Sequence, residues 1–303
     1  MSNYYKAIIA VIFANFFFGT TIIAVKHITP SLISPIALTS VRVVATAFLF
    51  WTFFGFQKNK QPFTRKDFYI LIVCSVLGIS FNQAFSITGM SLTSPIHASL
   101  LILTTPITIT ILAAIFLKEK LTRYKIAGLL LGLSGGALLI FSRDLSVINK
   151  GDQTMGDLFV IMGALCYSTY VVLMKSLATK YTNLSILKWV FLMGIIISLP
   201  LGWHDLQKVE WHSFDALSWI CLSYVVIGAT FLAYLFMNYG ISEIGASRTS
   251  AYMYSQPFFA AISAVIILHE SLSLPKIVAA SLIMSGVYLA NLSHSSRANP
   301  AAV

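Results

Sequence analysis

Long apolar runs, each separated from the next by a short polar segment, follow one another along the whole chain. A helix needs about 20 mainly apolar residues to cross the hydrocarbon core of a membrane. Backbone groups without hydrogen bonds are costly in hydrocarbon, so these runs must be helices, and they lack the alternating pattern of barrel strands. We predict spans at residues 5–25, 36–56, 68–88, 96–117, 124–141, 157–178, 185–202, 216–239, 248–268 and 275–292. The pattern predicts an all-α integral membrane protein with ten transmembrane helices.

Composition supports this fold class. Of the 303 residues, 57% are hydrophobic and 10% are charged, and the mean hydropathy is +0.84, whereas about a quarter of a soluble domain is charged. The net charge of +10 does not indicate nucleic-acid binding, because Lys and Arg lie in short loops between the apolar runs. Cys74, Cys166 and Cys221 lie inside apolar runs without CxxC or metal-ligand spacing, and we interpret them as packing residues. The first run lacks a signal-peptide cleavage site and is predicted to be a span.

The distribution of charge predicts the orientation. If the N-terminus is cytoplasmic, most of the 20 Lys and Arg residues fall in cytoplasmic segments, while most acidic residues fall outside. Basic residues near span ends favour the cytoplasmic side. We therefore expect a multi-pass protein of the cytoplasmic (inner) membrane, with both termini cytoplasmic and an even number of spans.

An internal repeat is the strongest single signal in the chain. At an offset of 151 residues, without a gap, Pro, Glu and Gly recur in one register. The pairs include Pro106 with Pro257, Glu119 with Glu270, and Gly135 with Gly286. Five helices per half is an odd number, so the halves would run in opposite directions across the membrane, as in carriers that work by alternating access. We predict a first repeat at 1–142, an outer linker at 143–156, a second repeat at 157–296 and a cytoplasmic tail at 297–303.

These residues resemble a known family. In each half a Pro-containing fourth helix ends in Glu-Lys-Leu or Glu-Ser-Leu, at 119–121 and 270–272, and a Gly-rich fifth helix follows. Together with Arg42 in the second span and Phe18-Gly19 in the first, the pattern resembles the EamA-type, ten-helix branch of the drug/metabolite transporter superfamily. The aromatic residue before this Gly is more typically Trp in that family. The resemblance covers essentially the whole chain and implies transport, but it names no substrate, because the family carries amino acids, other metabolites and drugs.

Polar residues near the middle of spans are candidate substrate-binding residues. Asn15, Tyr167, Thr105 and Gln256 are predicted to face one another across the axis between the halves. Pro106 and Pro257 each remove one helical hydrogen bond and could expose backbone carbonyls beside Thr105 and Gln256. The alternative is that Ser and Thr bond back to their own helices and that proline only kinks the chain. The amides of Asn15 and Gln256 carry the stronger expectation, because amides need partners in hydrocarbon.

A second group is predicted at the two mouths of the same cavity. Gln83 and His97 lie in outer halves of spans, whereas Tyr234 and Tyr252 lie in inner halves. The alternatives are interfacial snorkelling for His97 and packing for Tyr252. Separately, we expect Glu119 and Glu270 to stabilise helix ends, for example by bonding loop N–H groups or Lys118. Arg42 is deep enough to need a partner and shallow enough to snorkel outward.

The motifs that are absent narrow the function. The sequence has no GxxxxGK[ST] phosphate loop, no HExxH and no catalytic triad at matched depth. No Asp or Glu lies mid-span, and the lack of a central Lys or Arg argues against dedicated phosphate or nucleotide-sugar binding. We expect a carrier rather than an enzyme, without cofactor or metal, that exports or equilibrates neutral or zwitterionic amino-acid-like metabolites. A proton-coupled drug/metabolite exporter, a membrane-embedded enzyme and a channel remain alternatives. The expected partners are the substrate and lipid but not nucleic acid, and the oligomeric state is left open, with a monomer among the options.

Overall fold

A computed structural model describes residues 3–29, 31–55, 62–92, 101–141, 153–268 and 274–292. Within these ranges the protein is helical and contains no strand. Six helical runs are long and apolar enough to cross a membrane, namely Asn3–Val25, Pro35–Phe54, Arg65–Gly89, Thr154–Ala178, Asn183–Leu206 and Ala216–Ile244. Shorter apolar helices lie at Thr105–Phe116 and Ile277–Ala290. The expectation of an all-helical, multi-pass membrane protein is confirmed at this level.

The first part of the chain begins with α1 (Asn3–Ile28) and α2 (Pro35–Phe54). A continuous helical run follows, formed by α3 (Arg65–Cys74), the π-helix η1 (Ser75–Phe81) and α4 (Asn82–Leu92). After it come α6 (Thr105–Phe116) and α7 (Arg123–Phe141). Side-chain oxygens set two of these boundaries, because Ser34 and Thr64 accept hydrogen bonds from backbone N–H groups in the first turns of α2 and α3.

The second part begins with α8 (Gln153–Ala178), α9 (Asn183–Leu206) and the short 3₁₀ turn η2 (Trp211–Ser213). Next is a continuous run of α10 (Ala216–Ser223), the π-helix η3 (Tyr224–Leu232) and α11 (Ala233–Ile244). Gly245, at φ +92°, separates this run from α12 (Ala246–Ala251). The 3₁₀ turn η4 (Tyr252–Ser255), α13 (Gln256–Leu268) and α14 (Leu274–Leu292) complete the described chain.

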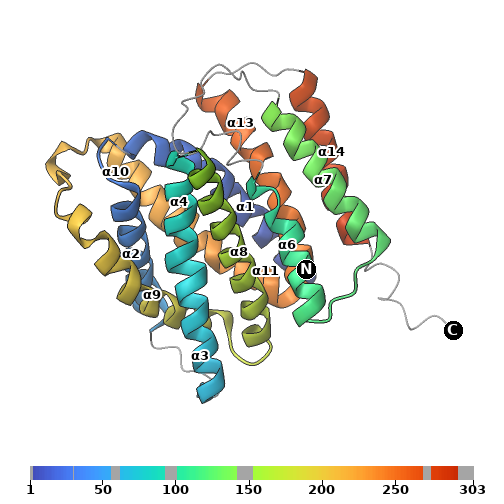
Figure 1. Cartoon of the computed structure of the whole chain (residues 1–303), viewed down its shortest axis with the longest axis horizontal. Helices are drawn as coiled ribbons and strands as arrows, with labels where there is room; N and C mark the ends of the chain where they lie inside the picture. Colours follow the sequence, from blue (N-terminus) through green and yellow to red (C-terminus); the bar gives the residue numbers. More distant parts are fainter. Residues whose placement is uncertain are drawn as a thin grey trace.

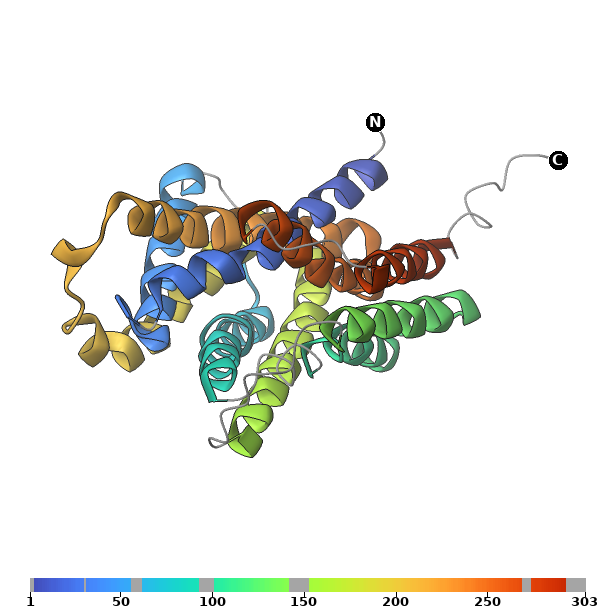
Figure 2. The same ribbon diagram turned by 90° about the horizontal axis from the view of Figure 1, so that it is seen from above.

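The packing joins helices from distant parts of the sequence. The main pairs are α7 with α14, α2 with α9, α4 with α8, and α1 with α11; α1 also packs on α13, and α6 on α8. Figures 1 and 2 show α7 and α14 side by side at one end of the molecule. Glycines permit this approach, since a Cβ on Gly286 would lie 2.6 Å from the backbone nitrogen of Gly132, and one on Gly128 would lie 2.5 Å from the backbone oxygen of Gly286.

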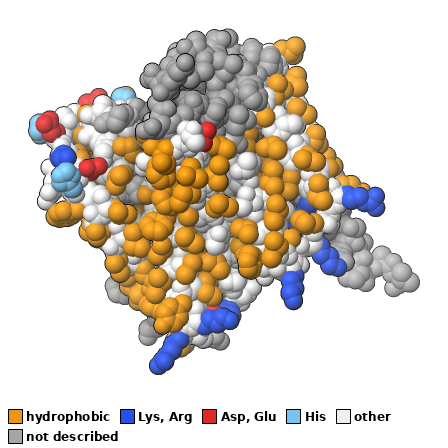
Figure 3. Space-filling model, in the orientation of Figure 1, with side chains coloured by type: hydrophobic (Ala, Val, Ile, Leu, Met, Phe, Trp, Pro, Cys, Tyr) orange, Lys and Arg blue, Asp and Glu red, His pale blue; other side chains and the backbone are white. Residues whose placement is uncertain are grey.

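The surface is apolar across its middle. Figure 3 shows hydrophobic side chains covering the centre of one face, with most visible Lys and Arg along its lower part and acidic and His side chains gathered at the upper left. The largest core cluster lies inside the bundle and includes Phe50, Tyr170, Phe191 and Tyr234. Cys74 is buried, and all three cysteines are free thiols. No group of metal-binding side chains occurs among the described residues.

Candidate functional site

Arg42 on α2 points into the bundle rather than outward. Its side chain is buried, and the residue is 8% exposed. The Nε–H donates a 2.9 Å hydrogen bond to the Thr230 hydroxyl on η3, which itself donates to the backbone oxygen of Val225. Outward snorkelling is therefore wrong for Arg42, and so is the premise that no Lys or Arg lies in the core. The sequence gives the depth of Arg42 but not the direction of its side chain.

Tyr234 and Gln83 lie beside Arg42. Tyr234, one turn along the helical run from Thr230, is buried, and its hydroxyl donates a 3.2 Å bond to the backbone oxygen of Gly78 in η1. The Arg42 and Gln83 side chains both lie close enough to this tyrosine to interact with it. Gln83 is 5% exposed, yet neither its Oε1 nor its Nε2 makes a hydrogen bond of ordinary geometry. Such an amide is costly to bury unless a partner is supplied.

Tyrosines extend this polar region toward α8. The Tyr170 hydroxyl and the Asn238 amide are hydrogen bonded, with the Asn238 Nδ2 donating over 2.9 Å. The ring of Tyr170 lies 6.1 Å from that of Tyr234 and 5.9 Å from that of Tyr167, measured between centroids. We name Arg42, Gln83, Tyr167, Tyr170, Thr230, Tyr234 and Asn238 the central polar cluster. It is formed where α2, α4, α8, η3 and α11 meet.

Asn15 and Gln256 form a second polar contact, between α1 and α13. The Gln256 Nε2 donates a 2.8 Å hydrogen bond to Asn15 Oδ1, and the fully buried Asn15 amide donates to the Val11 carbonyl. The helices approach closely here, because a Cβ on Gly19 would lie 2.5 Å from the backbone oxygen of Gln256. Phe18, on the same helix, packs edge-on against Tyr234. The aromatic–Gly pair of α1 thus contacts both polar groups.

The two prolines lie at breaks in helical geometry. Thr105 and Pro106 are buried at the start of α6, directly after a turn in which the Thr104 N–H bonds to the Leu101 oxygen. Pro257 lies in the first turn of α13, directly after the 3₁₀ turn η4. Both prolines therefore lie in the first turn of a helix, where the missing N–H has no intrahelical partner, and not inside a helix where a hydrogen bond would be lost.

Three further predicted residues lie outside these clusters or outside the described chain. Tyr252 is buried against Ala7, Val11 and Ile244, in a separate apolar cluster near the start of α1. The structure thus places its side chain apart from the central polar cluster. His97 and Glu270 fall outside the described residues.

Glu119 joins the loop after α6 to the start of α12. Its Oε1 accepts a 3.1 Å bond from the Ala246 N–H, and its Oε2 accepts from the Ser247 hydroxyl at 2.5 Å and from Lys125 Nζ at 3.4 Å. Burial acts to raise the pKa of this carboxyl, but the bonds from Ser247, Lys125 and Ala246 outweigh it, so the pKa lies below its usual value of 4.5. The cationic partner is Lys125, not Lys118. We call this set of contacts the Glu119 clasp.

A second clasp, which the sequence analysis did not identify, lies at the start of α3. Asp67 accepts hydrogen bonds from Lys180 Nζ at 2.9 Å, from the Tyr181 hydroxyl at 2.8 Å and from Thr64 at 2.7 Å. Asp67 is buried, whereas the Lys180 side chain is half exposed. The Asp67 clasp ties the start of α3 to the loop between α8 and α9. Only its acidic residue in a first helical turn could have been noticed from sequence.

Comparison with known proteins identifies the family. A family model described as the EamA-like transporter family matches residues 5–141 and again residues 154–292. The chain belongs to the EamA-like transporter family. It is therefore a multi-pass membrane transporter and not an enzyme, and its substrate is a small molecule.

Several relatives carry the same general description. An uncharacterized transporter of Bacillus subtilis, YyaM, is 28% identical over 193 residues, covering 64% of this chain and 63% of that protein, so the match spans less than two thirds of YyaM. Another from B. subtilis, YoaV, is 24% identical over 96% of this chain and 99% of its own. The WAT1-related protein At3g53210 of Arabidopsis thaliana is 24% identical over 82% of this chain and 74% of its own. A solved crystal structure at 18% identity has a TM-score of 0.79 over 95% of this chain and 97% of its own, which shows a shared fold.

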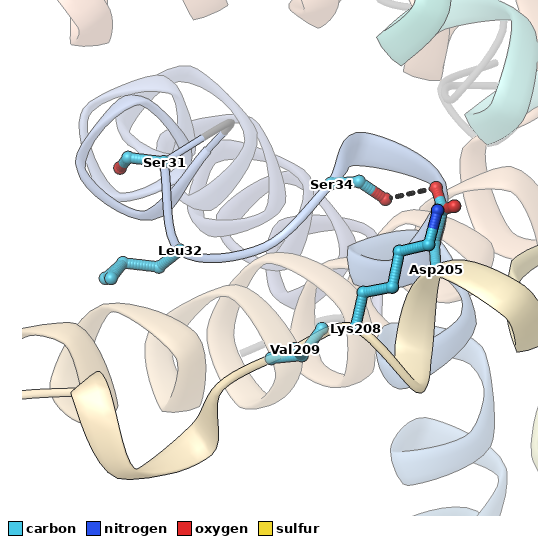
Figure 4. Close-up of a pocket in the computed structure, with 6 residues that line it drawn as sticks. All are labelled: Ser31, Leu32, Ser34, Asp205, Lys208 and Val209. Atoms are coloured by element: carbon cyan, nitrogen blue, oxygen red, sulfur yellow. Dashed lines mark hydrogen bonds between the residues drawn. The ribbon is translucent and has the colours of Figure 1, made fainter.

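The surface pocket of this EamA-like transporter lies away from both polar groups. Ser31, Leu32, Ser34, Asp205, Lys208 and Val209 line it, from the loop after α1 and the end of α9 (Figure 4). The Ser34 hydroxyl donates a 2.6 Å hydrogen bond to Asp205 across it. That bond joins the ends of α2 and α9, which already pack along their lengths. The pocket is therefore a surface feature between helix ends rather than the predicted substrate site.

Proposed function

We propose that this EamA-like transporter is an alternating-access carrier of ten transmembrane helices, built from two inverted five-helix repeats. The proposed repeats are residues 1–142 and 157–296, joined by an outer linker at 143–156 and followed by a tail at 297–303. Both termini are cytoplasmic in this proposal, and the membrane is the cytoplasmic one. The carrier exports or equilibrates small, neutral or zwitterionic, amino-acid-like metabolites.

The observation that carries the repeat is the placement of the two π-helices. Adding the offset of 151 to the bounds of η1, Ser75–Phe81, gives residues 226–232, which lie within η3, Tyr224–Leu232. π-Helical segments are rare and often accompany functional sites. Two of them at equivalent positions support a common architecture for the halves.

Helix packing also supports two equivalent halves. If the halves are exchanged, α1 on α11 becomes α8 on α4, and α1 on α13 becomes α8 on α6; all four contacts exist. The pairs α2 with α9 and α7 with α14 exchange onto themselves. In Figure 1, the α3–α4 run rises from the lower edge, whereas the equivalent α10–α11 run descends. These opposite directions are the ones that an inverted repeat requires.

The orientation and substrate class rest on charge. Most visible Lys and Arg side chains gather toward one edge of the molecule (Figure 3), which favours that edge as cytoplasmic. The binding groups are proposed to be the paired amides of Asn15 and Gln256 and the hydroxyls and amides of the central polar cluster. Within the described spans, the central polar cluster contains no carboxylate, which favours transport down the substrate gradient over proton coupling.

The test is transport by purified protein in liposomes. Asn15→Ala and Gln256→Ala should each reduce exchange of radiolabelled amino acids several-fold, since losing one buried hydrogen bond costs about 1 to 3 kcal/mol. Because the two amides bond to each other, the double variant should lose little more than either single variant. Leu138→Ala, on α7, controls for general loosening. Normal exchange by both single variants would remove this pair from the site, and exchange that does not saturate would favour a channel.

A further inference from the structure

Arg42 is a buried cation that has no carboxylate partner among the described residues. In the part of the chain that the structure describes, the ion pairs use Glu119, Asp67, Asp205 and Glu210, and none includes Arg42. The one hydrogen bond that Arg42 makes to another described side chain is from Nε to the Thr230 hydroxyl. The two terminal nitrogens, which form the fork of the guanidinium, are not used in that bond.

A guanidinium in this position needs an acceptor. Arginine stays protonated in proteins and offers five N–H donors, so it cannot lower the cost of burial by losing its charge. Burying such a charge without an anionic or hydrogen-bonding partner is strongly unfavourable. The protein keeps Arg42 inside nevertheless, which is expected if another molecule supplies the missing anion for part of the transport cycle.

Two neutral polar side chains nearby also have unsatisfied atoms. Neither amide atom of the buried Gln83 makes a hydrogen bond of ordinary geometry, and Gln83 and Arg42 both lie against Tyr234. Thr46, one turn beyond Arg42 on α2, is fully buried, and its hydroxyl makes no hydrogen bond. The Gln83 NH₂ group and the Thr46 hydroxyl are therefore further donors beside the guanidinium for which the described residues supply no acceptor.

We propose that Arg42 binds the carboxylate of the transported substrate through its terminal N–H groups, with the Gln83 amide donating a further hydrogen bond. A planar carboxylate matches the guanidinium fork and forms two parallel, charge-assisted bonds. The inference rests on the proposed carrier function and refines its substrate class, because it requires an ionised carboxylate rather than any polar neutral molecule.

The charge count selects a carboxylate over a phosphate. One guanidinium balances one negative charge, and a phosphate dianion would require a second cation. The other described buried cations are already engaged elsewhere: Lys125 pairs with Glu119, and Lys188 donates to the backbone oxygens of Phe54 and Gly55. A free phosphate or a phosphorylated metabolite therefore fits less well than an amino or keto acid.

The experiment compares acids with amides of the same shape. Wild-type protein in liposomes is tested for counterflow of radiolabelled L-alanine, L-leucine and L-phenylalanine, with the unlabelled acids, their carboxamides and inorganic phosphate as competitors. We expect the acids to compete at least about tenfold better than the amides, because a charged bond is lost in each amide. This arm needs no variant, so it does not depend on whether a substituted protein folds.

Variants then assign the effect to Arg42. Arg42→Gln should abolish the preference for acids over amides, Arg42→Lys should retain part of it, and Arg123→Gln, which removes an exposed arginine at the start of α7, should leave it intact. Amides that compete as well as acids in wild-type protein, or an unchanged preference in Arg42→Gln, would overturn the inference while leaving the carrier proposal standing. Stronger competition by phosphate would overturn the choice of carboxylate. If the protein exchanges neither the amino acids nor their carboxamides, the proposed amino-acid-like substrate class is wrong, and this inference fails with it.

Discussion

The Glu119 clasp allows a quantitative prediction about stability. Glu119→Gln preserves the shape of the side chain but removes its charge and replaces one acceptor oxygen with an NH₂ donor. If the new NH₂ group takes the place of Oε1, it faces the Ala246 N–H; if it takes the place of Oε2, it faces Ser247 and Lys125. In either orientation one set of donors loses its acceptor. Bonds to charged groups contribute about 1.5 to 3 kcal/mol each, and neutral bonds about half as much. We expect Glu119→Gln to lower the free energy of unfolding by about 2 kcal/mol, and Glu119→Ala by about 3 to 4 kcal/mol.

The assay is thermal unfolding in detergent, followed with a thiol-reactive fluorophore that labels Cys74 when the buried thiol becomes exposed. For a chain of this size, 1 kcal/mol corresponds to about 2 °C or slightly more, so Glu119→Gln should lower the Tm by about 4 °C. Glu210→Gln is the matched control, because Glu210 is exposed on a loop and, among the described residues, forms an ion pair only with His212, at 3.9 Å. A change in Tm below about 1 °C for both Glu119 variants would refute the reasoning.

The pH dependence gives a second test of the same clasp. Because the pKa of Glu119 is lowered in the folded protein, its contribution is fully present above the unfolded value of about 4.5 and is lost as the pH falls through the folded value below it. The difference in Tm between wild type and Glu119→Gln should therefore be constant from pH 8 to about pH 5.5 and should shrink below about pH 4.5. A difference that grows on acidification would contradict the assigned direction.

Three further predictions follow from other contacts. Asp67→Asn should lower the Tm by several degrees, because the amide keeps one acceptor oxygen but loses the ion pair with Lys180. Tyr181→Phe should lower the Tm by less, because it removes only one hydrogen bond to Asp67. No effect of either variant would show that the clasp does not stabilise this conformation. Gly286→Leu should reduce the yield of folded protein far more than Ser281→Leu on the exposed face of α14, since a side chain at 286 would overlap the backbone of Gly132. A cysteine at Ser146 should react with an impermeant thiol reagent in intact cells, whereas one at Ser296 should not; the reverse result would contradict the proposed orientation.

Hydropathy predicted the positions of the helices well but not their ends or internal geometry. The predicted span at 185–202 becomes α9, Asn183–Leu206, because Thr182 caps its start and Pro200 is tolerated inside the helix. The span at 68–88 gives no sign of η1, since a π-helical segment changes hydrogen bonding without changing which residues are apolar. Helix ends and π segments depend on local caps and on neighbouring helices, which periodicity does not report.

The candidate site was predicted in part. Asn15 and Gln256 were expected to face one another, and they are in contact, because two mid-span amides must find partners in hydrocarbon. Arg42 was assigned to a motif rather than to the site, since a single sequence gives the depth of a side chain but not the face of the helix that turns inward. Thr230 was missed because a threonine in a span usually bonds to its own helix; here it does so and also accepts from Arg42.

The Asp67 clasp gives the proposed inverted repeat an asymmetry that we expect to influence its resting state. The repeat offset places Ser218 at the position equivalent to Asp67, and Ser218 bonds to Asp215 of its own helix end and approaches His27 at 3.5 Å. The cytoplasmic contact in the proposal is thus a buried carboxylate paired with a lysine of the other half, whereas the outer counterpart has a serine at that position, bonded to Asp215. We expect the ion pair with Lys180 to strengthen the cytoplasmic contact and so to favour the state that is closed toward the cytoplasm. Weakening it with Asp67→Asn should therefore shift the population as well as lower the Tm, because the proposed outward-closed state would not contain this contact.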